Sequence, residues 1–289
     1  MWRLLLLLAT CACNQVFGLR ETQVVDAAYY DAPIDAPFRC PDLGGAPPLY
    51  SRLVHQVVTQ DCWDYTFSTN PDIPIAVGFC ANAGTGTRVL EESPVDEDGM
   101  HPIAELAPVP AVRVIDQFRL APEGDEAYAR VTATSTATLS RFRRSSTGAW
   151  SKDADLTIPI MVLDSVGSVT RRSLGPRLIV QRYDRTFHEY VPDGTGAWMD
   201  VQSYAPTAFG LTLPSDPRIT PDGLRMIFTA NSGLFTTSTY FTDRASVSEA
   251  FGPPRLLADV SIALTPVMTE DCARLYFTAL GSVLWVQQR

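Results

Sequence analysis

Short apolar runs separated by polar turn residues recur along the C-terminal two thirds of the chain. Residues 226–229 (Met-Ile-Phe-Thr) and 275–278 (Leu-Tyr-Phe-Thr) are two examples rich in aromatic and aliphatic side chains. Runs of this length between turn signals are typical of strands that are buried on both faces. Because no long stretch of this region has the 3.6-residue apolar period of a helix, the pattern predicts an all-β fold.

A turn motif precedes each of these runs. Residues 217–229 read Pro-Arg-Ile-Thr-Pro-Asp-Gly-Leu-Arg-Met-Ile-Phe-Thr, and residues 266–278 read Pro-Val-Met-Thr-Glu-Asp-Cys-Ala-Arg-Leu-Tyr-Phe-Thr. In Pro-Asp-Gly the proline presets φ, the aspartate bonds to nearby backbone and the glycine tolerates a positive φ. The motif therefore predicts a tight turn that leads into a central strand.

The motif recurs four times at a nearly constant interval, with weaker copies at residues 118–129 and 173–180. The aligned positions are separated by steps of 51, 48 and 49 residues and are Glu126, Arg177, Arg225 and Arg274. A Gly-Ala-Trp sequence keeps the same interval at Trp150 and Trp198. Repeats of this length are typical of propeller blades, which are small sheets that bury their faces by stacking around an axis.

The interval also predicts the number of blades. Residues 40–289 accommodate a β-propeller of five four-stranded blades, and six blades with a heavily eroded start are the alternative. The recognisable repeats cover residues 116–289, so residues 40–115 are predicted to be a diverged first blade. The last repeat ends before any counterpart of the Gly-Ala-Trp strand. We therefore expect an N-terminal strand, from the region after Cys40, to complete the final blade and close the ring.

The repeat resembles the TolB-type propeller repeat, in which Pro-x-Leu-Ser-Pro-Asp-Gly precedes an aromatic strand. The matching positions in the best copy are Pro217, Ile219, Pro221, Asp222, Gly223, Ile227 and Phe228. Proteins of this type usually have six blades of slightly shorter period, and the longer interval here favours five. The whole chain also resembles uncharacterised propeller lipoproteins of myxobacteria, a resemblance that implies no particular activity.

The first residues resemble a bacterial lipoprotein signal. Arg3 precedes an apolar run at residues 4–9, which is too short to cross a bilayer as a permanent helix. Residues 8–15 read Leu-Ala-Thr-Cys-Ala-Cys-Asn-Gln and are similar to a lipobox. The resemblance implies that residues 1–12 are the signal peptide and that Cys13 carries the lipid. A cleaved secretory signal without a lipid is the alternative.

Residues 13–39 are expected to be a lipid-anchored tether, because their Asp-Ala and Asp-Ala-Pro repeats lack any sustained apolar period. In the lipoprotein family an aspartate after the cysteine retains the protein at the inner membrane. Asn14 occupies that position here, which implies the outer membrane or the cell surface, with the periplasmic side left open.

With Cys13 lipidated, four further cysteines would suit two disulfides in an oxidising compartment. They allow three connectivities and are Cys40, Cys62, Cys80 and Cys272. The 18-residue step between Cys62 and Cys80 favours that pair and leaves Cys40 to join Cys272, whereas buried thiols are the alternative. Because the sequence contains no Cys-x-x-Cys, neither a zinc nor a redox site is predicted.

Charge and motif content favour a binding module. The formal net charge of −9 repels nucleic acid and anionic lipid. His55, His101 and His188 lack metal-ligand spacing and no Gly-x-Ser-x-Gly elbow is present, so no catalytic residue, cofactor or metal is assigned. We expect non-catalytic binding of a protein, peptide or glycan of the cell envelope. The alternative is a hydrolase or lyase that acts on glycosides or lactones with carboxylates or a calcium ion in the central channel.

Overall fold

The computed structural model describes residues 50–57, 62–69, 75–81, 88–96, 99–100, 104–106, 114–133, 136–146, 148–231, 237–261, 264–269, 274–279 and 282–288. The chain divides into two compact units, Met1–Pro37 and Phe38–Arg289, and every described residue belongs to the second. The predicted signal peptide, the tether and Cys13 therefore lie outside the described residues. No helix long and apolar enough to cross a membrane occurs in the described ranges.

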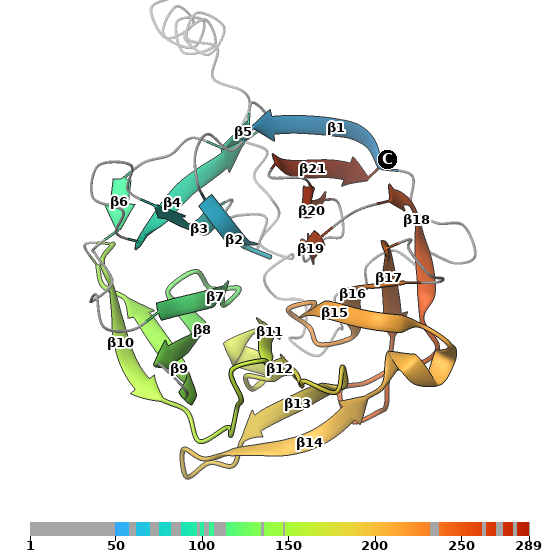
Figure 1. Ribbon diagram of the computed structural model, residues 1–289. Helices are drawn as coiled ribbons and strands as arrows, with labels where there is room; N and C mark the ends of the chain where they lie inside the picture. Colours follow the sequence, from blue (N-terminus) through green and yellow to red (C-terminus); the bar gives the residue numbers. More distant parts are fainter. Residues whose placement is uncertain are drawn as a thin grey trace, which may run out of the picture. The chain divides into compact units, whose positions relative to one another are not determined.

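The described residues form five antiparallel sheets, the blades, arranged around a common centre (Figure 1). Blade 1 contains β2 (Cys62–Phe67), β3 (Ile75–Ala81), β4 (Arg88–Asp96), β5 (Gly99–Met100) and β6 (Ala104–Leu106). Blade 2 contains β7 (Val114–Leu120), β8 (Glu126–Ala133), β9 (Thr136–Arg144) and β10 (Trp150–Asp155). Blade 3 contains β11 (Ser165–Val169), β12 (Leu178–Gln181), β13 (Phe187–Pro192) and β14 (Trp198–Tyr204).

Blade 4 contains β15 (Thr212–Ile219), β16 (Arg225–Asn231), β17 (Thr237–Asp243) and β18 (Arg255–Ser261). Blade 5 contains β19 (Leu264–Met268), β20 (Arg274–Ala279), β21 (Ser282–Gln288) and β1 (Tyr50–Val57). Two short 3-10 helices interrupt the loops, η2 (Arg172–Leu174) in blade 3 and η3 (Pro206–Phe209) between blades 3 and 4. The predicted all-β fold is therefore confirmed.

The innermost strands of the blades contact one another in a circle. β2 contacts β7, β7 contacts β11, β11 contacts β15, β15 contacts β19, and β19 contacts β2. β1 lies at the outer edge of blade 5, where it pairs with β21 so that His55 is opposite Leu284. The described chain thus forms a five-bladed β-propeller in which an N-terminal strand completes the last blade, as predicted.

The predicted turn before each central strand is present in blade 4. The Asp222 carboxylate accepts hydrogen bonds from the Leu224 amide at 3.0 Å and the Thr220 hydroxyl at 2.6 Å. Gly223 has a φ of 75°, and Gly124 has the same φ at the corresponding turn of blade 2. The strand that follows, β16, pairs with both β15 and β17, and its first six residues are buried. The local chemistry of Asp and Gly therefore places this apolar strand in the middle of its sheet.

Two buried arginines connect the innermost strands of blades 2 and 4 to that of blade 3. Arg119 donates from Nε to the Val166 carbonyl at 3.1 Å, and Arg218 donates from its guanidinium to the Gly167 carbonyl at 2.6 Å. Both side chains belong to residues that are only 2% exposed. β11 is therefore held from both sides by charge-assisted hydrogen bonds, which are stronger than neutral ones.

Aromatic side chains fill the spaces between the blades. Trp150 lies edge-on to Phe118 of the same blade with ring centroids 5.2 Å apart, in a cluster that includes Val77 of blade 1. Trp198 of blade 3 lies edge-on to Tyr128 of blade 2 at 6.0 Å. Between blades 3 and 4, Phe187 packs edge-on against Phe228 at 5.4 Å. Edge-to-face contacts of this kind add to the apolar area that stacking removes from water. The two tryptophans of the Gly-Ala-Trp sequences are therefore packing residues.

Candidate binding surface

The candidate site lies at the end of blade 3 where β11 begins. Ser165 is opposite Gln181, and Gln181 is opposite Phe187. Residues 161–164, which lead into β11, and the turn at residues 182–186 between β12 and β13 therefore lie at the same end of the blade.

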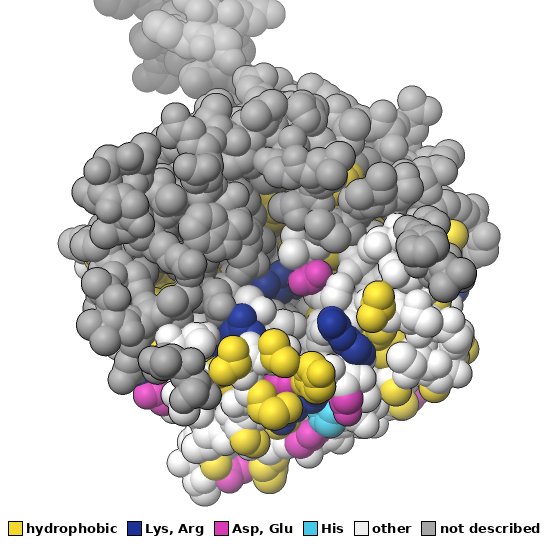
Figure 2. Space-filling model, viewed as in Figure 1, with side chains coloured by type: hydrophobic (Ala, Val, Ile, Leu, Met, Phe, Trp, Pro, Cys, Tyr) yellow, Lys and Arg dark blue, Asp and Glu magenta, His cyan; other side chains and the backbone are white. Residues whose placement is uncertain are grey.

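Four large apolar side chains are exposed on these two segments. Met161 is 57% exposed, Val162 39%, Leu163 65% and Tyr183 60%. Figure 2 shows hydrophobic side chains gathered on the face over β11 and β12. Single exposed apolar residues are ordinary on protein surfaces, but a contiguous group indicates a contact surface. We call Met161, Val162, Leu163 and Tyr183 the apolar platform.

The buried carboxylate of Asp164 joins the two segments that carry the platform. It accepts hydrogen bonds from the Met161 amide at 2.8 Å, the Tyr183 amide at 2.8 Å and the Arg182 guanidinium at 2.9 Å. Asp164 is 1% exposed. The carboxylate thus satisfies one backbone amide from each segment while Arg182 balances its charge, as a buried charge requires.

Arg130, on β8 of blade 2, contacts the backbone of the segment that carries Met161, Val162 and Leu163. Its guanidinium donates to the Val162 carbonyl at 2.6 Å and to the Asp164 carbonyl. The backbone under the exposed apolar side chains is therefore fixed by side chains from two blades. A surface fixed before binding loses less conformational entropy when a partner arrives.

A polar cluster lies beside the platform on β13, β14 and the turn between β12 and β13. His188 Nδ1 is 2.6 Å from an Asp200 carboxylate oxygen, and His188 Nε2 is 2.9 Å from the Thr186 hydroxyl. The Thr186 hydroxyl donates to Asp184 at 2.6 Å. Hydrogen bonds from the hydroxyl and the amide of Thr186 lower the pKa of Asp184. The four side chains form one continuous chain of hydrogen bonds.

The order Thr186, His188, Asp200 is that of a nucleophile, a base and an orienting acid. A nucleophilic hydroxyl must point its proton at the base, whereas the Thr186 proton points at Asp184. The Thr186 amide is also bonded to Asp184, at 3.0 Å, and so does not serve as an oxyanion donor. Both ring nitrogens of His188 thus have hydrogen-bond partners, and we interpret the cluster as a polar border of the platform.

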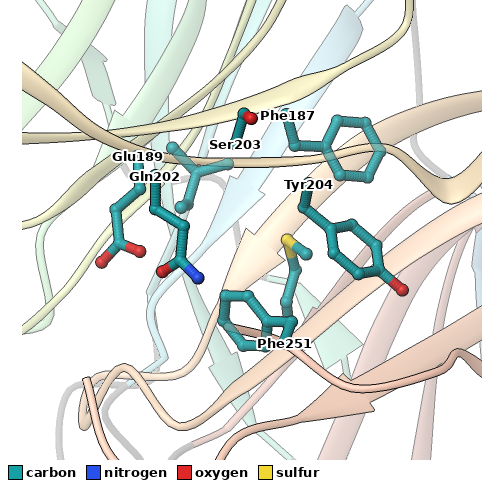
Figure 3. Close-up of a pocket in the computed structure, with 8 residues that line it drawn as sticks. Phe187, Glu189, Gln202, Ser203, Tyr204 and Phe251 are labelled. Carbon is teal, nitrogen blue, oxygen red and sulfur yellow. The ribbon is translucent and has the colours of Figure 1, made fainter. Parts of the chain in front are cut away.

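A small cavity between blades 3 and 4 has room for about one water molecule. Figure 3 shows Phe187, Tyr204 and Phe251 around it, with Glu189 and Gln202 at its edge. Burial raises the pKa of the Tyr204 hydroxyl to about 12, so this group is neutral at physiological pH. The cavity is too small for an organic ligand, and we interpret it as a packing gap.

The polar edge of this cavity belongs to an ion pair between the blades. Arg244 donates to both carboxylate oxygens of Glu189 at 2.7 and 3.0 Å, and Arg177 donates to Glu189 at 2.8 Å. The Arg244 guanidinium also lies 4.3 Å from the centre of the Phe251 ring. These contacts are structural, because they join blade 4 to blade 3.

The cysteines singled out in the sequence are only partly within the described residues. Cys62 begins β2 and is directly opposite Cys80 of β3. Cys13, Cys40 and Cys272 lie outside the described ranges. In those ranges, no group of three or more His, Cys, Asp or Glu side chains is arranged to hold a metal ion.

Sequence reasoning did not find the platform or its polar border. The exposure of Met161 to Leu163 depends on the pairing of Asp164 with a segment about twenty residues away, and no motif marks that pairing. The sequence indicates only that His188 lacks metal-ligand spacing. Its contact with Asp200 follows from the pairing of β13 with β14.

No family model matches the chain, and no curated protein sequence matches it. The fold resembles fructofuranosidase from Schwanniomyces occidentalis complexed with fructose, at 9% identity and a TM-score of 0.54, over 78% of this chain and 54% of that one. A variant of that enzyme complexed with fructosylnystose gives 10% identity and a TM-score of 0.55, over 83% and 58%. TolB from Acinetobacter baumannii gives 8% identity and a TM-score of 0.47, over 80% and 55%.

This chain thus spans little more than half the length of each of these three structures. At such low identity, the likeness to the fructofuranosidase shows the fold alone. Together with the observed topology it defines the class: the chain is a β-propeller protein.

Proposed function

We propose that this protein is a non-catalytic binding module of the cell envelope whose apolar platform contacts a protein or peptide partner. The observation that carries the proposal is the exposure of Met161, Val162, Leu163 and Tyr183 on backbone that Asp164 and Arg130 hold in place. Methionine and tyrosine are enriched in protein interfaces, and a fixed apolar surface is typical of a preformed contact site. A glycan is the alternative ligand.

In this proposal residues 1–12 direct export, Cys13 carries the lipid and residues 13–39 link it to the propeller of residues 40–289. The lipobox-like sequence and Asn14 support an outer-membrane or cell-surface location, with the lipid as the contact to the membrane. The net charge of −9 supports a partner other than nucleic acid.

The alternative of a channel hydrolase or lyase requires carboxylates that converge near the axis. On the described parts of the innermost strands, Asp216 of β15 is a half-buried carboxylate. The buried charged side chains there are Arg119 and Arg218, and both donate to backbone carbonyls of β11. These two arginines connect neighbouring blades, which is a structural role. We therefore retain the binding proposal.

Site-specific photo-crosslinking in the native envelope tests the proposal. A photoreactive residue at position 163 should give a discrete adduct with one protein, and the substitutions Met161→Ser and Tyr183→Ser should each reduce that adduct at least about tenfold. The matched control is position 174, because Leu174 is also apolar and 42% exposed but lies at the opposite end of blade 3.

Thermal unfolding of each variant checks that the fold is intact, since the substituted side chains are exposed. Equal adducts from positions 163 and 174, or an adduct unaffected by the two substitutions, would contradict the proposal. Adducts that disappear after enzymatic removal of envelope glycans would support the glycan alternative.

A further inference from the structure

Cys62 and Cys80 occupy directly opposite positions on two paired strands. β2 and β3 are antiparallel neighbours in blade 1, and their register sets Cys62 against Cys80 and Trp63 against Phe79. The spacing of the cysteines in sequence allows three disulfide connectivities and favours Cys62 with Cys80. The register distinguishes them, because it brings this pair together through backbone hydrogen bonding alone.

Residues that face each other across antiparallel strands have Cα atoms about 4.5 or 5.5 Å apart, depending on the type of pair. Disulfides usually join Cα atoms about 4.4–6.8 Å apart. Both kinds of cross-strand pair therefore lie within the range that a disulfide spans without movement of the backbone. We propose that Cys62 and Cys80 form a disulfide that fastens β2, the innermost strand of blade 1, to β3.

The position of the pair suggests what the bond does. β2 contacts both β7 and β19 and so belongs to the circle of innermost strands. The pairing of β2 with β3 is interrupted by a register shift between Trp63 and Thr66. A register shift weakens the pairing of the residues next to it. A covalent link at Cys62, which begins β2, would hold this end of the strand in register with β3.

The chemistry requires an oxidant, and we assign this role to a protein disulfide of the export compartment. The thiolate of one cysteine attacks the donor disulfide, forms a mixed disulfide and releases one donor thiolate. The second cysteine thiolate then attacks the mixed disulfide and releases the other donor sulfur. Cys62 and Cys80 together lose two electrons and two protons, and the donor becomes a dithiol. The reaction is independent of the partner proposed for the apolar platform.

Peptide mass mapping of the exported full-length protein, purified without reductant and alkylated while denatured, tests the pairing. No Lys or Arg separates the two cysteines, so the chain should be cut before aspartates, including Asp64 and Asp72. We expect the two cysteine peptides to remain linked, to escape alkylation and to weigh two hydrogens less than the free pair. Reduction should separate them.

Two single variants and one matched control complete the test. Cys62→Ser should expose Cys80 to alkylation, Cys80→Ser should expose Cys62, and each should lower the melting temperature by about 5–10 °C. Cys40→Ser should leave the linked peptides unchanged. Alkylation of both residues in the unreduced protein, or a link from either one to Cys40 or Cys272, would overturn the proposal. Because the peptide map of the natural sequence gives this answer directly, a variant that fails to fold does not prevent a decision.

Discussion

Arg244 shows how a single side chain holds two blades together. Its side chain is fully buried, and the carboxylate of Glu189 that it contacts is 3% exposed. Gly223 accepts a further hydrogen bond from Arg244 Nε at 2.7 Å. Taking both charges out of water is costly, and their mutual attraction offsets that cost only while both partners are present. Removing one partner leaves the other charge buried and unbalanced.

We therefore predict that Glu189→Gln destabilises the protein by about 3–5 kcal/mol, because Arg244 and Arg177 would lose their shared carboxylate. The control is Lys152→Ala, which removes an exposed ion pair with Asp155 and should cost less than about 1 kcal/mol. Urea unfolding measures both. If Glu189→Gln costs no more than the control, the ion pair does not hold the blades.

The aligned residues of the repeat also explain an apparent mismatch in the sequence. Glu126 occupies the position of Arg225, although the two have opposite charges. In the structure Glu126 is opposite Arg143 across β8 and β9, and Arg225 is opposite Asp243 across β16 and β17. In blade 2 the acidic residue is on the second strand and the basic residue on the third, and in blade 4 the order is reversed. Each blade therefore retains a pair of opposite charges across the two strands. The amino-acid sequence gives the residue types at these positions. Their cross-strand partners can be identified only once the register of the strands is known.

At the scale of elements, the close approach of β11 and β15 depends on Gly167. A Cβ atom at this position would lie 2.5 Å from the Pro217 carbonyl oxygen and 2.8 Å from the Ile179 carbonyl oxygen. Both neighbours are backbone atoms, which cannot turn aside as a flexible side chain can. The absence of a side chain therefore lets β15 approach β11, where Arg218 reaches the Gly167 carbonyl.

Gly167→Ala is accordingly predicted to destabilise the protein by about 1–3 kcal/mol, because the added methyl group must push the innermost strands apart. Gly252→Ala provides the comparison, since its Cβ would meet the Asp243 carbonyl oxygen at 3.4 Å, an ordinary contact. The urea midpoint of each variant measures the effect. Equal midpoints would mean that the strands are not in tight contact at Gly167.

Strands and turns were the most predictable elements, because their signals are local. The Pro-Asp-Gly turn, the buried strand after it and the strand beginning at Trp198 follow from residues that are close in sequence. The apolar platform was not predictable in this way. Its geometry depends on Asp164, whose contacts come from the separate turn at residues 182–186 and from blade 2 through Arg130. Periodicity carries no information about such long-range polar contacts.

At the scale of the whole molecule, closure depends on β1. This strand pairs along its length with β21, from Tyr50 opposite Gln288 to Val57 opposite Ser282. Without β1, the last blade would have three strands, and β21 would present an unpaired edge. The strand was predictable because the final repeat lacks its fourth strand and a closed ring requires one.

Deletion of residues 1–57 should therefore lower the urea midpoint by about 1 M or more, since the loss of a paired strand costs several kcal/mol. Deletion of residues 1–37, the first compact unit, is the matched control and should leave the midpoint unchanged. Tryptophan fluorescence follows unfolding in both proteins. An unchanged midpoint after the longer deletion would show that β1 is not needed to hold the ring together.

The pairing of β1 with β21 also sets an order of events during biosynthesis. The ribosome makes β1 first and β21 last, with more than two hundred residues between them. At about 5–20 residues per second, the first strand waits on the order of ten to forty seconds for its neighbour. The ring therefore cannot close until translation is nearly complete.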